Sequence, residues 1–380
     1  MDQKTTSVFS FVKFFILSIF VFGLSFQSQA NEDAHSADSA TFDPATMIMH
    51  HISDAHDWHI ATIGHTHITI PLPVILYYKI DNRTGVEMFL SSNFHTSSIE
   101  DDGESVDGNP VDGFRKDHHE HIYYEKDGKP YHEAKIYDFS ITKNVASILV
   151  SAVLLLVVFL SVAAGYKKNK GKAPKGIQSF FEPLIVFIRD EIAVPNIGEK
   201  KYMFFMPYLL TVFFFIWFNN LLGLVPTGAN VTGNISVTMT LAVLTLIITN
   251  VFGNKDYWMH ILWTPGVPLP LRLIILPVEV LGIITKPFAL MIRLFANITA
   301  GHCIILSIMS FIFIFKSVGV AAGSVPFAVI MNVMEFAVAI LQAYIFTLLS
   351  ALFIGSAVEE HEHHHEEHHS HDKPMAVAHY

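Results

Sequence analysis

Apolar residues gather in the later part of the chain, where they form five long runs. The runs lie at residues 145–165, 202–225, 235–252, 273–315 and 326–355. A membrane-crossing helix needs about 20 mostly apolar residues, and each run approaches or exceeds that length. The pattern therefore predicts an all-α polytopic membrane domain over residues 143–357.

The last two runs are longer than one bilayer crossing requires. Residues 273–315 lack a turn-forming cluster, and a straight helix of that length would extend roughly 60 Å. Such a helix must tilt strongly or bend at a proline to fit a membrane. With a turn at residues 316–325, we expect a hairpin of two long, strongly tilted helices beside vertical spans.

Lysines set the expected orientation of the spans. Five lysines lie within residues 167–175, and basic clusters beside a span favour the cytoplasmic side. Residues 176–200 mix apolar and charged side chains, which predicts an amphipathic helix at the inner interface. The chain then crosses outward and back, and residues 253–272 are expected to form a proline-broken inner loop.

Residues 1–30 have the composition of a secretory signal peptide. Lys4 and Lys13 precede an apolar core, and the small residues before and at Ala30 fit a cleavage site. An uncleaved anchor is the alternative, although the core is short for a span. Cleavage would leave the mature chain starting outside the cytoplasmic membrane.

Residues 31–142 form an aqueous region that is rich in His, Asp and Gly. Residues 73–80 and 85–90 are typical of short strands around a turn at 81–84. Residues 99–113 are acidic and glycine-rich, which is typical of a mobile segment. These patterns do not indicate what the region does.

Charge is segregated along the chain, although half of all residues are hydrophobic. The net charge of −10 combines 7 basic and 20 acidic side chains in residues 31–142 with 14 basic and 7 acidic in residues 143–357. The tail, residues 358–380, is also acidic. A basic membrane body with acidic aqueous ends argues against nucleic acid as a partner.

Cysteine and histidine usage limits metal and redox chemistry. The single Cys303 excludes an intrachain disulfide and a cysteine-based metal cage, and we expect it to pack in a helix. Histidines are frequent in residues 31–142 and in the tail, where either zinc binding or a solvated surface would account for them. We assign no metal and no cofactor to the chain. The histidines of the first region include His50, His51, His56, His59, His65 and His67.

One permanent charge lies in the middle of the fourth apolar run. The guanidinium of Arg293 stays protonated at any accessible pH, and its burial at bilayer depth costs about 2.5 to 17 kcal/mol. Such a cost indicates a water-lined path or a buried partner. The alternative is an arginine that extends to an interface, but roughly 20 mostly apolar residues lie on each side.

Index arithmetic places other polar residues beside this arginine. In an antiparallel helix pair, the residue numbers of two residues at equal height add up to a constant, which we call the index sum. The sum is 635 for Arg293 and Gln342, and 637 for His302 and Glu335, which puts the turn near residue 318. We therefore expect Arg293 to face Gln342 and His302 to face Glu335, the second pair about 10–14 Å nearer the outer surface.

This seam of polar residues suits proton handling. A carboxylate beside an imidazole in a low-dielectric cleft can be tuned toward neutral pH, and both groups exchange protons. Asn297 lies one turn from Arg293, and Glu279, toward the inner side, could serve an opposite opening. A closed polar network that only ties two helices together is the alternative.

Several motifs resemble subunit a of the rotary F-type ATP synthase, the membrane stator beside a ring of c subunits. The motif Arg-Leu-Phe-Ala-Asn at residues 293–297 is similar to the family's Arg-Leu-Phe-(Gly/Ala)-Asn pattern. Residues 341–346 resemble its final helix, and residues 218–226 resemble the end of its second span. The resemblance covers about residues 140–357.

The resemblance implies a role for each polar residue of the seam. Arg293 would be the essential arginine that separates two offset half-channels and releases the proton from each c-subunit carboxylate. Glu335 and His302 would belong to the outer half-channel, and Glu279 would line the inner one. Polar lining would come from Asn220, Asn297 and Gln342.

The chain also departs from the family pattern. Many bacterial relatives have Glu at the position of His302 and His at the position of Glu335, so the pair is exchanged but the acid–base couple is kept. Residues 47–51 resemble the family's N-terminal segment, which implies that about 60–137 are a β-containing periplasmic insertion. The His/Glu-rich tail is expected to be solvated and cytoplasmic.

Partners and location follow from the resemblance. It implies a multi-pass protein of the bacterial inner membrane that contacts lipid, the c ring and a peripheral stalk of b subunits, with protons as the transported ion. No phosphate-cradling glycine loop is present, so the chain is not expected to be an enzyme by itself. A proton-coupled secondary transporter, which should show inverted repeats, and a structural scaffold are the alternatives.

Overall fold

The structure is a computed structural model, and it describes most of the chain. The predicted signal peptide, nearly all of the acidic stretch at 99–113 and the tail after Glu359 lie outside the described residues. The described residues are 48, 53–63, 66–81, 83–94, 113–116, 120–126, 129–131, 133–225, 228–263 and 268–359.

Helices make up the second part of the chain. By length and composition α3, α6, α9 and α10 could each cross a membrane, and α7 with α8, bent by 102°, would form a fifth span if the pair is one crossing. The chain is therefore a multi-pass, mainly helical membrane protein, as predicted. The helices are α3 (Lys143–Lys168), α4 (Ile177–Phe187), α5 (Val194–Ile197), α6 (Tyr202–Gly223), α7 (Ile235–Val251), α8 (Lys255–Leu262), α9 (Leu269–Phe315) and α10 (Val318–Val358).

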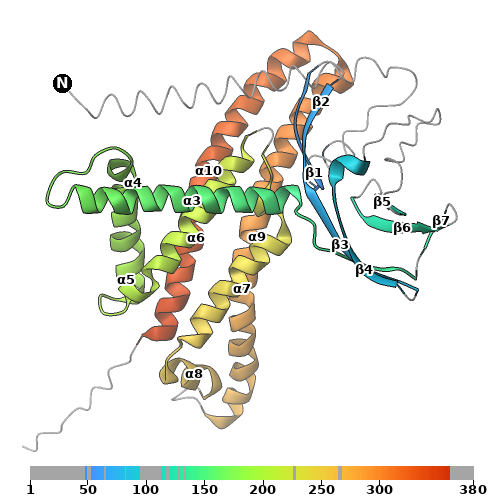
Figure 1. The fold of residues 1–380 in the computed structure, drawn as a ribbon. Helices are drawn as coiled ribbons and strands as arrows, with labels where there is room; N and C mark the ends of the chain where they lie inside the picture. Colours follow the sequence, from blue (N-terminus) through green and yellow to red (C-terminus); the bar gives the residue numbers. More distant parts are fainter. Residues whose placement is uncertain are drawn as a thin grey trace, which may run out of the picture.

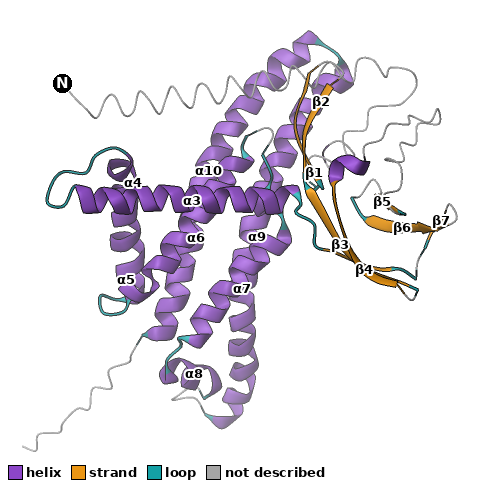
Figure 2. Cartoon of the chain, in the orientation of Figure 1, coloured by secondary structure: helices purple, strands orange, loops and turns teal. Residues whose placement is uncertain are grey.

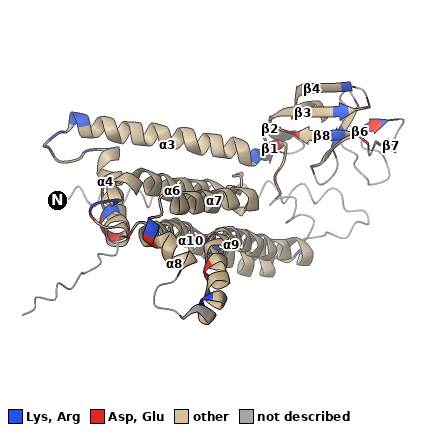
Figure 3. Ribbon diagram, turned by 90° about the horizontal axis from the view of Figure 1, so that it is seen from below, with Lys and Arg blue, Asp and Glu red and all other residues tan. Residues whose placement is uncertain are grey.

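The long helices are stacked in layers. Helix α3 packs against α6, α6 packs against α10, and α7 packs against α9. Seen from below, α3 forms one layer, α6 and α7 the next, and α9 and α10 the third (Figure 3). Figure 1 shows that α3 crosses the direction of α9 and α10 at a steep angle.

Aromatic side chains fill the space between the layers. The Phe214 ring of α6 is fully buried, with its centroid 4.9 Å from Phe159 of α3 and 5.6 Å from Phe181 of α4. Helix α6 is apolar on all sides, which is the pattern of a helix surrounded by others. It is therefore the centre of the helical core.

The predicted amphipathic helix at residues 176–200 is present in three consecutive segments. Helix α4 continues through a π-helical segment, η2 (Ile188–Ala193), into α5. Ile188 and Ile192 are fully buried in the core around α6. The apolar face of this region thus packs on the other helices.

Two predicted helix boundaries were wrong. Helix α10 begins at Val318, so the expected turn at 316–325 is helical except for its first two residues. Lys316 adopts a left-handed conformation (φ 44°), which ends α9 and reverses the chain at once. Pro326 lies inside α10. The expected inner loop at 253–272 contains α8 and the start of α9.

The preceding region is built from short antiparallel strands (Figure 2). Strand β1 (Asp57–Ile63) pairs with β2 (Thr66–Pro71), and a three-stranded sheet has the order β4-β3-β8. The predicted strands at 73–80 and 85–90 are confirmed as β3 and β4. The remaining elements are β3 (Pro73–Ile80), β4 (Arg83–Leu90), η1 (Ser91–Phe94), β5 (Phe114–Lys116), β6 (Ile122–Lys126), β7 (Lys129–Pro130) and β8 (Lys135–Asp138).

A small core holds this β region together. Val74 and Leu76 of β3 have no exposed surface and lie in one cluster with Phe94 and with Phe114 of β5. Strand β3 alternates inward and outward side chains, so its other face points away from this core. The β region has its own hydrophobic core, separate from that of the helices.

Candidate functional site

The seam between α9 and α10 contains the predicted His302–Glu335 pair. The Nδ1 atom of His302 lies 2.5 Å from Oε1 of Glu335, and its Nε2 atom lies 3.3 Å from the carbonyl oxygen of Gly223 at the end of α6. The side chain of Glu335 is 5% exposed. A carboxylate and an imidazole thus share a short hydrogen bond away from bulk solvent, as the index arithmetic predicted.

A glycine makes this close approach possible. A Cβ atom added to Gly301 would lie 2.9 Å from Oε1 of Glu335, closer than real Cβ atoms are found. Any larger residue at this position would therefore push the carboxylate away from His302. Position 301 of α9 is consequently part of the site.

The predicted pairing of Gln342 with Arg293 was wrong. Gln342 is buried, and its Oε1 atom accepts a hydrogen bond of 2.8 Å from Nδ2 of Asn297 rather than from Arg293. The index sum gives the height of a residue along the helix pair but not its direction around the axis, which turns about 100° per residue. Arg293 lies next to the buried Leu294 and points to the exposed side of α9.

Asn220 joins the end of α6 to this seam. Its Nδ2 atom donates to the carbonyl of Ala339 in α10 at 3.3 Å, and its Oδ1 atom accepts from the Thr232 hydroxyl at 2.7 Å. Asn220 and Thr232 are both buried. Thr232, in the 3-10 turn η3 (Val231–Gly233), was not singled out from the sequence, since nothing in its local pattern distinguishes it.

A small, mostly apolar cavity lies on the other side of Arg293, away from the hairpin turn. It has a volume of about 20 Å³, enough for one water molecule, between α7, α8, α9 and α10. The polar residues that contribute to its lining are Thr245, Thr249, Asn250, Tyr257 and Lys286. Glu279 is partly exposed on α9 and interacts electrostatically with Tyr257. Sequence reasoning identified Glu279 but not the cavity.

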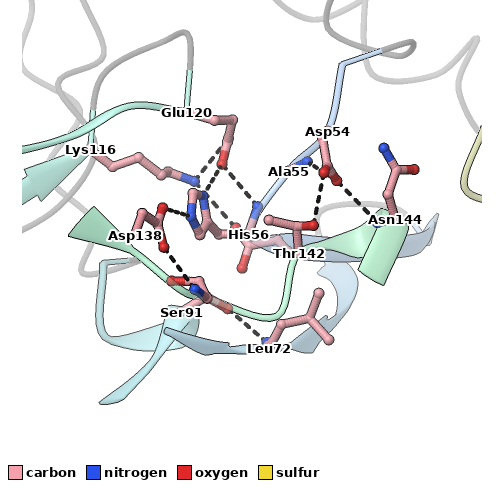
Figure 4. A network of polar contacts seen from close by, with 12 residues as sticks. Asp54, Ala55, His56, Leu72, Ser91, Lys116, Glu120, Asp138, Thr142 and Asn144 are labelled. Carbon is pink, nitrogen blue, oxygen red and sulfur yellow. Dashed lines mark hydrogen bonds and ion pairs between the residues drawn. The ribbon is translucent and has the colours of Figure 1, made fainter. Parts of the chain in front are cut away.

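A second histidine–carboxylate cluster ties the β region together (Figure 4). The ring nitrogens of His56 lie 3.1 Å from Oε2 of Glu120 and 2.9 Å from Oδ2 of Asp138. The buried Lys116 donates to Oε1 of Glu120 at 3.0 Å. We call His56, Lys116, Glu120 and Asp138 the outer cluster.

The charges of the outer cluster stabilise one another. Burial by itself would lower the pKa of His56, but hydrogen bonds to Asp138 and Glu120 outweigh it and raise the pKa to about 9. Burial would likewise raise the pKa of Glu120, but its hydrogen bond with His56 and the charge of Lys116 lower it to about 2. His56 is therefore an imidazolium over the physiological pH range.

Residues beside the outer cluster connect the β region to α3. Asp54 accepts hydrogen bonds from the backbone N–H of Asn144 and the hydroxyl of Thr142, the N-cap residue of α3. The backbone N–H of Lys143 donates to the carbonyl of Ala55 at 2.8 Å. The start of α3 is thus fixed to the β region, and we call these contacts the α3 clasp.

Among the described residues, no group of three or more His, Cys, Asp or Glu side chains is placed to hold a metal ion. His50, His51 and His65 lie outside the described residues. His56 has its two ring nitrogens engaged by carboxylates. His56 therefore serves ion pairing in the β region.

Comparisons with known proteins agree on the helical part. A family model described as ATP synthase A chain matches residues 145–355, and one described as a domain of unknown function (DUF8433) matches residues 47–139. ATP synthase subunit a 2 of Chlorobaculum tepidum is 52% identical over 235 residues, which cover 60% of this chain and 66% of the relative.

Two further relatives are matched over different shares of their own length. ATP synthase subunit a of Chloroherpeton thalassium is 46% identical over 259 residues, 65% of this chain and 77% of the relative. ATP synthase subunit a of Anaeromyxobacter sp. (strain Fw109-5) is 49% identical over 235 residues, 60% of this chain and 56% of the relative. With its helical part matched from the first span to the end of the last, the chain belongs to the ATP synthase A chain family.

Proposed function

We propose that the chain is the proton-translocating stator subunit of an ATP synthase. It works in a complex with other membrane subunits of that machine, and the chemistry of ATP belongs to other chains. The observation that carries the proposal is the short His302–Glu335 hydrogen bond in the seam of a family member. Each of these two groups can bind and release a proton.

Arg293 is the residue that separates two half-channels in this proposal. It lies on the exposed side of α9, and no hydrogen bond or ion pair joins it to the described residues. Ala289 and Ala296, on the same face, are exposed and small, which leaves room for a helix of a partner to approach closely. A permanent cation on such a face suits a passing carboxylate of a c-subunit ring.

The other polar residues are assigned to the two half-channels. The outer one contains His302 and Glu335, with Asn220, Asn297 and Gln342 as polar lining. The inner one contains Glu279, and the cavity beside Lys286 has room for one water molecule. Protons would enter through one path and leave through the other, with Arg293 preventing a direct leak.

The proposal includes an orientation in the bacterial inner membrane. Helix α3 stands upright with its lysine-rich end in the cytoplasm, the residues before it are periplasmic, and the C-terminus is cytoplasmic. Since α3 crosses α9 and α10 steeply, an upright α3 implies strong tilt of those two helices. The segment from α4 to α5 then lies near the inner interface, and b subunits form the peripheral stalk.

The test is Arg293→Ala in membrane vesicles that contain the assembled complex. ATP-driven proton pumping should be lost while the amount of assembled complex is unchanged, because the substitution removes the charge between the half-channels. Arg272→Ala is the matched control, since Arg272 lies on the same helix and its guanidinium stacks on Trp263 at 4.0 Å. Normal pumping by the Arg293 variant would contradict the proposal.

A further inference from the structure

One face of the β4-β3-β8 sheet is apolar and exposed. The inward side chains of β3 pack on Phe114 of β5, so the outward ones point away from the domain core. Neighbouring strands are in register on that outer face: Tyr77 lies opposite Val86 and Tyr137. The exposed apolar residues of this face are Tyr77, Val86, Met88, Leu90, Tyr137 and Phe139.

The exposure of this face is larger than scattered surface residues would give. Met88 of β4 is 69% exposed, and Phe139, the residue directly after β8, is 66% exposed. Contiguous apolar patches on aqueous domains mark interaction sites with proteins or membranes. We call this surface the outer sheet face.

The outer sheet face excludes acidic residues in a region that is otherwise rich in them. Residues 31–142 contain 20 acidic and 7 basic side chains. The charged residues of the outer sheet face are Lys79 and Lys135, which lie opposite each other in the register of β3 and β8. A face with lysines and no carboxylates suits an anionic surface.

The polarity of the outer sheet face changes with distance from α3. Phe139 is three residues from Thr142, the N-cap of α3, and Leu90 lies opposite Pro73 at the same end of the sheet. The tyrosines lie in the middle of the strands, and the two lysines lie at the far end. This order of apolar residues, tyrosines and lysines matches the order of hydrocarbon, interface and phosphate groups in a membrane leaflet.

The α3 clasp fixes the direction of this gradient. Strand β8 runs directly into α3, whose lipid-accessible side carries exposed Val145, Leu149 and Val153. Asp54 bonds to the first turn of α3, so the sheet is held in a defined position at the point where α3 begins. Figure 1 shows β5 to β7 on the side of β3 and β4 that is turned away from the helices.

We propose that the outer sheet face docks on the lipid surface of the membrane that α3 crosses. Its apolar end continues the apolar surface of α3 into the interface, and its lysines contact lipid phosphates. A protein partner would not require this order of residue types along the strands. The inference depends on the membrane-spanning role of α3 and is independent of proton translocation.

Depth measurements on the full chain test the docking. Nitroxide labels are attached to cysteines at Phe139, Met88, Tyr137 or Lys135, each in a Cys303→Ser background, and the protein is placed in vesicles of phosphatidylethanolamine and phosphatidylglycerol. Oxygen accessibility should be greatest and nickel-chelate accessibility smallest at Phe139 and Met88. Both should shift progressively toward aqueous values at Tyr137 and then Lys135. A label at Lys129, exposed on β7, is the aqueous control.

Three results would overturn the docking. Met88 and Phe139 labels as accessible to the nickel chelate as Lys129 would show a solvated face. Labels protected from both oxygen and nickel would show a protein partner, and dipolar broadening between chains would show a second copy.

A second measurement uses the unsubstituted chain. A phospholipid with a photoreactive group near its headgroup should label peptides from residues 73–90 and 135–139 but not from 122–130. Equal labelling of the two sets, or labelling of 122–130 alone, would contradict the docking even if a cysteine variant failed to fold.

Discussion

Two histidine–carboxylate clusters among the described residues differ in how many partners surround the imidazole. His56 lies between two carboxylates, and a buried lysine neutralises one of them. Within the described part of the chain, His302 has one carboxylate partner, Glu335, and otherwise approaches only the backbone carbonyl of Gly223. The first arrangement retains a proton, because its loss would leave Asp138 without a cation and Glu120 with Lys116 alone.

The second arrangement allows a proton to move. A proton between His302 and Glu335 can lie on either atom without leaving a second acid unpaired. The number of acidic neighbours, rather than the presence of a histidine, separates a structural ion cluster from a group suited to proton transfer.

The largest effect is expected from a charge exchange in the seam. His302→Glu and Glu335→His each place two like groups together, and each should lower ATP-driven pumping on the order of 100-fold, a typical loss for a proton-transfer group. The double variant restores one acid and one base and should recover part of the rate. If the double variant pumps no better than the worse single variant, the two residues do not act as a couple.

Gly301→Ala tests whether the short contact itself matters. The new methyl group would displace the Glu335 carboxylate, and we expect a roughly tenfold loss of pumping, less than the 100-fold that a 1 Å misplacement costs. Gly282→Ala on the same helix is the control, because a Cβ there meets no atom within 4 Å. Equal pumping by the two variants would show that the distance is unimportant.

His56→Ala should affect stability and not pumping. It leaves Glu120 and Asp138 without their shared donor, and should lower the opening free energy of the β region by about 1.5–3 kcal/mol. Hydrogen exchange of β3 amides in the full chain measures this. Lys126→Ala, which removes an ion pair with Asp81 that is about half exposed, should cost less than about 1 kcal/mol. If the His56 variant lost pumping but kept normal hydrogen exchange, His56 would have a role in proton transfer and not in stability.

The same opening free energy should also depend on pH. The pKa of His56 is raised from 6.5 to about 9, so its contribution is complete below pH 6.5 and is lost as the pH rises toward 9. The pKa of Glu120 is lowered from 4.5 to about 2, so its contribution is complete above pH 4.5 and is lost as the pH falls toward 2.

Stability of the β region should therefore be greatest between pH 4.5 and 6.5. The opening free energy, obtained from exchange rates corrected for intrinsic chemistry, should decline as the pH rises above 6.5. His56→Gln should remove that decline. If the opening free energy of the His56→Gln variant still declines equally at alkaline pH, a group other than His56 causes the decline.

Patterns along the chain predicted the helices and one polar contact well, for a physical reason. Apolar length determines which segments can cross a membrane, and a tight reversal between two helices determines which residues are level with each other. The bond between His302 and Glu335 therefore followed from their numbers alone. The direction of Arg293 did not, because rotation about a helix axis depends on side-chain packing.

The outer cluster was beyond prediction for a different reason. His56, Glu120 and Asp138 are far apart in the chain and meet only because separate strands bring them together. Their local sequences contain many other histidines and acids of the same kind. Long-range pairing of short strands leaves little trace in any one segment, whereas β3 and β4 were predictable because a two-residue turn joins them.

The connection between α9 and α10 consists only of Lys316 and Ser317. So short a link leaves no slack for one helix to slide along the other. Inserting a single residue anywhere between His302 and the link would rotate the donor by about 100° away from its acceptor. The two helices thus behave as one rigid unit with a fixed register, and a shift in that register would disrupt all the contacts between them.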